Sequence, residues 1–174
     1  MINIHIFIIN VFLNFWLCTL VNPTYDNATY ITYTLHRPVL VFVWTVSTLF
    51  GLFFYAKKIW DNVSFPYSKP AMIISCCAFL GGFFAPYSNK VLWTNNLHVW
   101  LIALALVLYL IQWIRFLISP LPQQNRFKQL FLLNIFIIFS ILFYYGQVNL
   151  IAEVYFSVSM NILLGLKAQK KGLV

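Results

Sequence analysis

Charged residues are scarce in this sequence, where they make up only 8% of 174 residues. A soluble domain carries roughly 25% charged residues, because it needs polar side chains to cover its apolar interior in water. Here 62% of the residues are hydrophobic, which leaves too little polar surface for that purpose. The composition excludes an ordinary soluble globular domain and predicts an integral membrane protein with lipid as its solvent.

Cysteines and acidic residues are also few, with three of each. Cys18, Cys76 and Cys77 fall within apolar runs, and none has the CxxC or Cys/His spacing of a metal site. Buried thiols of this kind behave as small apolar groups. The sequence also lacks GxSxG, HExxH and phosphate-loop motifs. We therefore expect no disulfide, no metal and no cofactor, while the question of enzymatic activity stays open.

Long apolar runs account for most of the chain. A transmembrane helix needs about 20 residues, and the runs predict an all-α, polytopic integral membrane protein, a six-transmembrane-helix bundle that forms a single domain over residues 1–174. The last two runs are close enough that one long re-entrant hairpin is the alternative. The connection at 22–35 alternates Tyr with Thr, which favours a short extended or interfacial segment. The predicted spans are 2–21, 38–56, 70–87, 97–118, 129–146 and 148–166.

The basic residues that give the chain its net charge of +8 predict its orientation. Lys and Arg near span ends stay on the cytoplasmic side. Three clusters fall on one predicted side, and only Arg37 and Lys90 fall on the other. Both termini are therefore predicted to be cytoplasmic, and nucleic-acid binding is not expected, since the charges lie between apolar runs. The clusters are Lys57, Lys58 and Lys69; Arg115, Arg126 and Lys128; and Lys167, Lys170 and Lys171.

Polar side chains inside the predicted spans form stripes at helical spacing. In the first span Asn3, Asn10 and Asn14 share one helical face. Lipid offers such groups no partner, so they face other helices or a cavity. The stripes predict helix packing held by hydrogen bonds. A second stripe, in the sixth span, contains Asn149, Glu153, Ser157, Asn161 and Gly165.

Glu153 is the only acidic residue within a predicted span. Inserting an acidic side chain at the membrane centre costs ~2.5–3.5 kcal/mol, which makes Glu153 a candidate functional residue. The structural alternative is that it caps a helix start or pairs with Arg37. The predicted topology brings histidines to the same outer end, where His and Glu together can relay a proton, bind a cation or act as acid and base. The predicted polar cleft contains Glu153, His98, His36, Asn95, Asn149 and Ser88.

The stretch from Ser75 to Ala105 combines a helix rich in small residues, a proline-containing outer connection and a polar, His-bearing helix. The residues of this pattern are Ser75, Gly81-Gly82, Pro86-Tyr87-Ser88-Asn89 and Asn95-Asn96-Leu97-His98, with Glu153 further along. In these residues, over about a fifth of its length, the chain resembles small six-span membrane proteins of the DRAM and Sfk type and related bacterial membrane proteins. The resemblance implies a role in membrane lipid handling or stress responses.

These observations favour a lipid-facing accessory or sensing protein with a polar cleft near the outer leaflet. The first alternative is a small oligomeric proton- or cation-coupled transporter that uses Glu153 and His98. The second is an intramembrane lipid-modifying enzyme. The expected partners are membrane lipids, together with a second copy of the chain or another membrane protein.

Overall fold

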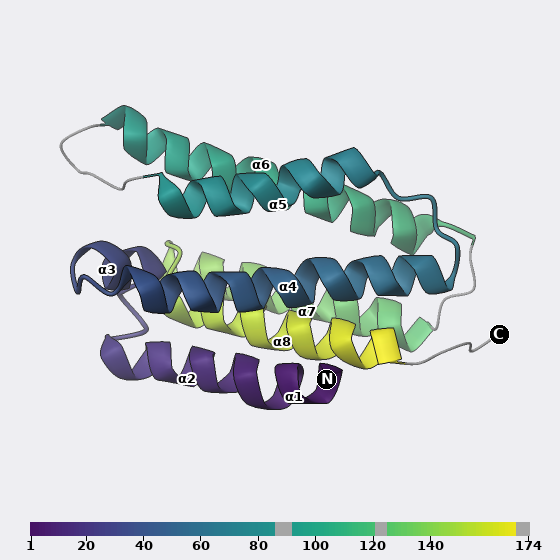
Figure 1. The fold of residues 1–174 in the computed structure, drawn as a ribbon, viewed down its shortest axis with the longest axis horizontal. Coiled ribbons are helices and arrows are strands. Elements are labelled where there is room, and N and C mark those ends of the chain that lie inside the picture. The colour runs from purple at the N-terminus through teal and green to yellow at the C-terminus, as the bar shows by residue number, and fades with distance from the viewer. Residues whose placement is uncertain (86–91, 121–124, 170–174) are drawn as a thin grey trace. The chain divides into compact units, whose positions relative to one another are not determined.

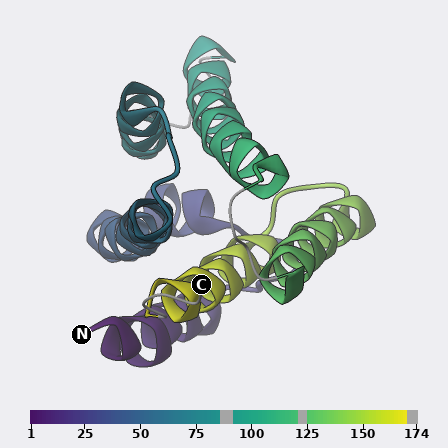
Figure 2. The same cartoon turned by 90° about the vertical axis from the view of Figure 1, so that its right-hand side faces the viewer.

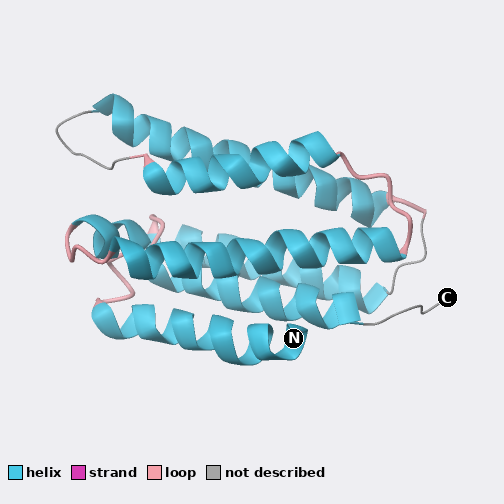
Figure 3. Ribbon diagram, in the orientation of Figure 1, coloured by secondary structure: helices cyan, strands magenta, loops and turns pink. Residues whose placement is uncertain are grey.

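A computed structural model describes residues 1–85, 92–120 and 125–169. Within these residues every regular element is a helix, as Figure 3 shows. The all-helical fold expected from the sequence is therefore confirmed for the described part of the chain. The chain divides into two compact units, a larger one formed by Met1–Asn62 with Pro122–Val174 and a smaller one formed by Val63–Leu121.

The larger unit begins with one continuous helix, Ile2–Leu20. It consists of α1 (Ile2–Ile4), a π-helical turn η1 (His5–Ile9) and α2 (Asn10–Leu20). In the π-helical turn the backbone N–H of Asn10 donates to the carbonyl of His5, five residues back rather than four. Such a turn rotates the side chains that precede it relative to those that follow.

Four further helices belong to the described part of the larger unit. They are α3 (Ala28–Tyr33), α4 (Pro38–Asn62), α7 (Asn125–Tyr145) and α8 (Leu150–Gln169). α4 and α8 run side by side in the same direction, and α1 to α2 runs against both (Figure 1). α7 packs along α8 on another side, as Figure 2 also shows. α8 is therefore the central helix of this unit.

Local signals explain where these helices begin and end. The Asn27 side chain accepts a hydrogen bond from the backbone N–H of Tyr30 and caps α3. α4 starts at Pro38, whose missing N–H costs nothing in the first turn. Gly146 has a φ of +66°, the left-handed conformation that ends α7 and lets the chain turn back into α8.

The smaller unit is a pair of helices, α5 (Lys69–Phe84) and α6 (Leu92–Ile118), that pack against each other. The Ser68 side chain caps α5 by accepting from the N–H of Ala71. Ser75 Oγ donates to the carbonyl oxygen of Ala105 at 2.7 Å. This bond satisfies a buried hydroxyl and holds the two helices in close contact.

Among the described residues, five helices are long and apolar enough to cross a membrane. The predicted span at 70–87 corresponds to α5, which has 16 residues and is therefore about 24 Å long, less than the ~30 Å hydrocarbon core. The bundle of six spans stays a prediction. Of the extended or interfacial segment expected at 22–35, the extended form is wrong for Ala28–Tyr33, which forms α3, and the interfacial position stays a prediction. The five helices are Ile2–Leu20, Pro38–Asn62, Asn96–Ile118, Asn125–Tyr145 and Leu150–Gln169.

Candidate functional site

Glu153 lies in the first turn of α8 and is half-buried. Its Oε2 atom accepts a hydrogen bond of 2.8 Å from the backbone N–H of Ala28, the first residue of α3. The carboxylate thus faces the amino-terminal ends of two helices, where the helix dipole favours negative charge. Glu153 forms no ion pair within the described part of the chain, so the predicted alternative of a pair with Arg37 is not found.

Asn149 is fully buried immediately before α8. Its Oδ1 atom accepts from the N–H of Ala152 at 3.1 Å and so caps the helix. Its Nδ2 group donates to the carbonyl oxygen of Thr24 at 3.0 Å. One side chain therefore caps α8 and ties it to the first connection of the chain, a structural role like the one proposed as the alternative for Glu153.

Backbone hydrogen bonds complete this attachment. The N–H of Leu150 donates to the carbonyl of Asp26 at 2.7 Å, and the N–H of Ile151 donates to the carbonyl of Pro23 at 3.2 Å. These are N–H groups of the first turn of α8, which have no partner inside their own helix. The first connection satisfies them, so residues 23–28 and the start of α8 form one fastened end of the unit.

A network of polar side chains lies deeper, between α2, α4 and α8. Asn14 is central: its Nδ2 group donates to Asn10 Oδ1 at 2.6 Å and to Ser157 Oγ at 3.1 Å. Its Oδ1 atom accepts from Trp44 Nε1 at 2.8 Å. Ser157 Oγ also shares a hydrogen bond of 2.7 Å with the hydroxyl of Thr48. The stripes predicted on the first and sixth spans thus meet each other, with α4 as the third partner.

His5 extends this polar region toward the other end of the helices and is buried. Its Nε2 atom lies 3.1 Å from both the carbonyl oxygen and the hydroxyl oxygen of Ser47. Its Nδ1 atom shares a hydrogen bond of 2.7 Å with the hydroxyl of Tyr55. Both nitrogens of a buried histidine are satisfied by α4.

Gly51 makes room where these groups converge. A Cβ atom at position 51 would collide with Asn161 Oδ1 and would lie 3.0 Å from His5 Cε1. Asn161 is fully buried, and its Nδ2 group donates to the carbonyl of Ser157 at 2.8 Å. Its Oδ1 atom has no hydrogen-bond partner among the described residues. The absence of a side chain at Gly51 therefore permits α4 and α8 to approach closely at this point.

The remaining members of the predicted cleft lie elsewhere. His98 belongs to α6 in the smaller unit, where its Nδ1 atom donates to the carbonyl oxygen of Gly82 at 2.7 Å. Asn95 is part of the same helix, and Ser88 lies outside the described residues. Glu153 and His98 each bond within their own unit, so their meeting in one cleft stays a prediction.

His36 is exposed and sits between α3 and α4 with a φ of +52°. Few residues other than glycine adopt this left-handed conformation. His36 and Arg37 stand at one end of a groove of about 610 Å³ between α2 and α4. The predicted cleft residue His36 is thus part of a different feature from Glu153, with which it shares no hydrogen bond that the structure records.

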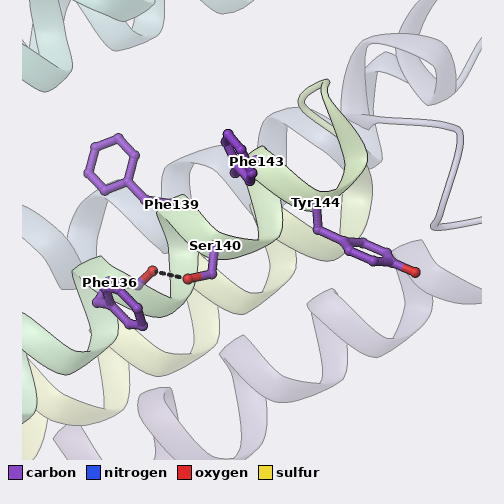
Figure 4. A pocket seen from close by; sticks show the side chains of 5 residues that line it. All are labelled: Phe136, Phe139, Ser140, Phe143 and Tyr144. Atoms are coloured by element: carbon purple, nitrogen blue, oxygen red, sulfur yellow. Dashed lines mark hydrogen bonds between the residues drawn. The ribbon is translucent and has the colours of Figure 1, made fainter.

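A second hollow of about 610 Å³ is lined by side chains of α7 alone. Figure 4 shows Phe136, Phe139, Phe143 and Tyr144 around Ser140, whose hydroxyl donates to the carbonyl of Phe136 at 2.9 Å. All four aromatic side chains are exposed. A hydroxyl satisfied by its own helix and ringed by exposed aromatics suits a lipid-facing surface.

Sequence reasoning did not single out His5 as a candidate residue. It also did not single out Tyr55, Ser47, Thr48 or Trp44, which supply the α4 side of the network. The one feature of the sequence that pointed to them was the stripe formed by Asn10 and Asn14, because amides inside a membrane need hydrogen-bonding groups on a neighbouring helix. The π-helical turn hid His5, because it aligns residues five apart that a regular helix would place on different faces.

Within residues 1–85, 92–120 and 125–169, no three His, Cys, Asp or Glu side chains gather as metal ligands would. The long apolar helices and the polar groups buried between them define a multi-pass helical membrane protein. No known protein family, curated protein or solved structure matches the chain.

Proposed function

We propose that this chain is a small accessory protein of the membrane, which contacts lipid and organises or senses other membrane components. In this proposal six helices cross the bilayer and both termini are cytoplasmic. The buried polar side chains give the bundle its specific packing, and they do not carry out catalysis or transport. The exposed apolar faces are the working surfaces.

The observation that carries the proposal is the hydrogen bond formed by Glu153. Its carboxylate accepts from the backbone N–H of Ala28 and so attaches the first connection to α8. Asn149 and the neighbouring backbone groups make the same attachment. The polar stripes of α2, α4 and α8 likewise bond to one another. Polar groups that satisfy each other in this way stabilise and specify a bundle.

The resemblance noted in the sequence supports the lipid part of the proposal. The exposed aromatic side chains of α7 agree with it, since a helix that buries little of its own surface in protein needs lipid or another membrane protein around it. The working partner is therefore proposed to be a lipid, a second copy of the chain or another membrane protein.

The proposed topology is tested by cysteine accessibility. Single cysteines at Asn27 and Gln123, introduced after the native cysteines are replaced, are expected to react from opposite sides of the membrane. The reasoning is the asymmetry of Lys and Arg between the two sets of connections. Reaction of both positions from the same side would contradict the six-span arrangement.

The accessory role is tested by complementation of a strain that depends on the protein. A double variant, Glu153→Gln with His98→Gln, keeps hydrogen bonding but cannot exchange a proton at either position. The accessory role predicts full complementation at normal membrane levels. Loss of complementation by a variant that is present and folded would instead support the proton-coupled transporter or the enzyme.

A further inference from the structure

The groove between α2 and α4 has one cationic end and apolar walls. Leu13, Trp16 and Leu20 line it from α2, and Val39 and Val43 line it from the first turns of α4. Because α2 and α4 are antiparallel, Leu20 lies near the start of α4 and Leu13 lies deeper. Leu13 and Leu20 are seven positions apart, which corresponds to about 10 Å along the helix.

The cationic end is formed by Arg37 and His36, which line the same groove. Both side chains are exposed, and Arg37 forms no ion pair with an acidic residue within the described ranges. A guanidinium binds phosphate through paired hydrogen bonds of matching geometry. This end of the groove therefore has a positive charge available to a phosphate group.

The backbone at His36 turns sharply between α3 and α4. Its φ of +52° is a conformation that glycine or asparagine would adopt at lower cost. This turn brings the His36 side chain to the groove beside Arg37. The imidazole adds a second hydrogen-bond donor beside Arg37.

We infer that this groove binds an anionic phospholipid, with its phosphate at Arg37 and His36 and one acyl chain along Leu13, Trp16 and Val43. A groove of about 610 Å³ falls within the ~300–1,000 Å³ typical of ligand sites. Trp16 is 44% exposed and Val43 is 46% exposed, so both present apolar surface to the chain. The inference extends the accessory role by naming a partner, and it rests on the membrane placement proposed above.

The test uses the full chain, purified in detergent micelles and mixed with equal amounts of phosphatidylglycerol and phosphatidylcholine that carry identical acyl chains. Native mass spectrometry then gives the ratio of the two lipids bound. We expect a preference for phosphatidylglycerol of about tenfold in the native protein, because both lipids offer a phosphate but the choline group of phosphatidylcholine carries a positive charge that Arg37 repels. Equal binding of the two lipids would overturn the inference.

Two pairs of variants assign the preference to the groove. Arg37→Gln is expected to abolish it, whereas Arg126→Gln, an exposed arginine at the start of α7, should leave it unchanged. Val43→Trp should block the chain and reduce binding of both lipids about tenfold. Val46→Trp is the matched control, since Val46 lies on the same helix with 43% exposure and does not line the groove. The inference would be overturned if the two arginine variants showed the same lipid preference and the two valine variants bound the same amount of lipid.

The valine pair decides the outcome if Arg37→Gln does not fold. Inorganic phosphate is added as a competitor at 100-fold excess over the lipid, and it should not displace phosphatidylglycerol. If phosphate displaces the lipid and Val43→Trp binds lipid as the native protein does, the site binds free phosphate. That result would also overturn the inference. His36→Gly should keep the melting temperature while lowering the preference, whereas a purely structural imidazole would lower the melting temperature. These measurements are independent of orientation, so a wrong topology would appear only in the cysteine labelling.

Discussion

α7 and α8 are neighbouring helices of 21 and 20 residues that differ sharply in what they bury. Of α7 only Phe127 and Phe131 are buried. α8 contacts the first helix, α4 and α7, and its buried residues come from every turn. They are Leu150, Ala152, Ser157, Met160, Asn161, Leu164, Gly165 and Ala168.

The difference in burial between α7 and α8 follows from the kind of side chain on one face of each helix. Both helices are apolar enough to cross a membrane, so hydrophobicity alone does not separate them. α8 places small and polar side chains on its buried face, and these permit close approach and hydrogen bonding between helices. α7 carries large aromatic side chains on its exposed face. In lipid, where apolar surface is already solvated, the small and polar stripe identifies the central helix.

The largest expected effect tests close approach on α8. A Cβ atom at Gly165 would lie 2.6 Å from Ile6 Cγ2 and 3.2 Å from Tyr55 Cε2. Gly165→Leu should therefore force the first helix and α4 away and destabilise the protein by about 3 kcal/mol. Ser140→Leu adds a comparable side chain to the exposed face of α7 and should be tolerated. The measurement is thermal unfolding in detergent, and equal melting temperatures for the two variants would contradict the comparison.

The next effect concerns hydrogen bonding by two serines. Ser157→Ala removes the partner of Thr48 and one partner of Asn14, both buried, which should cost about 1–3 kcal/mol. Ser140→Ala removes a bond that stays within α7, at an exposed position, and should change stability by less than about 0.5 kcal/mol. The two changes are chemically identical, so their difference in unfolding free energy reports the environment alone.

A smaller effect is expected at the start of α8. Glu153→Leu leaves the N–H of Ala28 without its acceptor and should cost about 1–2 kcal/mol. Glu153→Gln keeps an oxygen at this place and should be close to neutral in stability. Thermal unfolding of both variants separates two roles for Glu153. If it serves only as the acceptor for Ala28, Glu153→Leu should lower the melting temperature and Glu153→Gln should not. If its negative charge is required, both variants should lower it equally.

The smallest effect is expected on the exposed face of α7. Phe143 is 92% exposed. Phe143→Ala should change the unfolding free energy by less than about 0.5 kcal/mol, whereas Phe→Ala in a protein core costs ~3–5 kcal/mol. Loss of stability on the core scale, seen in membrane extracts but not in dilute detergent, would mean that a second protein covers this face.

Much of the fold was accessible from the sequence, because apolar runs and helix signals coincide. The predicted spans match helices to within several residues. α4 runs past residue 56 to Asn62 because Lys57 and Asp61 pair one turn apart, which stabilises a helix beyond the apolar run. α3 was missed, since six residues carry too little periodicity and its Asn27 cap resembles an ordinary turn residue.

The candidate site was accessible only in part. Periodicity placed Asn10 with Asn14 on one face, and it aligned Ser157 with Asn161. Periodicity could not predict which helix each stripe packs against, because a polar stripe can pack on any helix that presents small or polar residues. It placed Glu153 near Asn149 correctly but could not foresee that the N–H of Ala28 would be its partner. Such pairings depend on the tertiary arrangement.

The fastened end of the larger unit has a consequence for biogenesis. Ala28 and Glu153 are 125 residues apart in the chain. At a synthesis rate of ~5–20 residues per second, the first connection waits roughly 6–25 s for the helix that holds it. During that interval the first connection lacks its hydrogen bonds to α8. A chain cut short before Leu150 lacks the hydrogen bonds that join the first connection to α8.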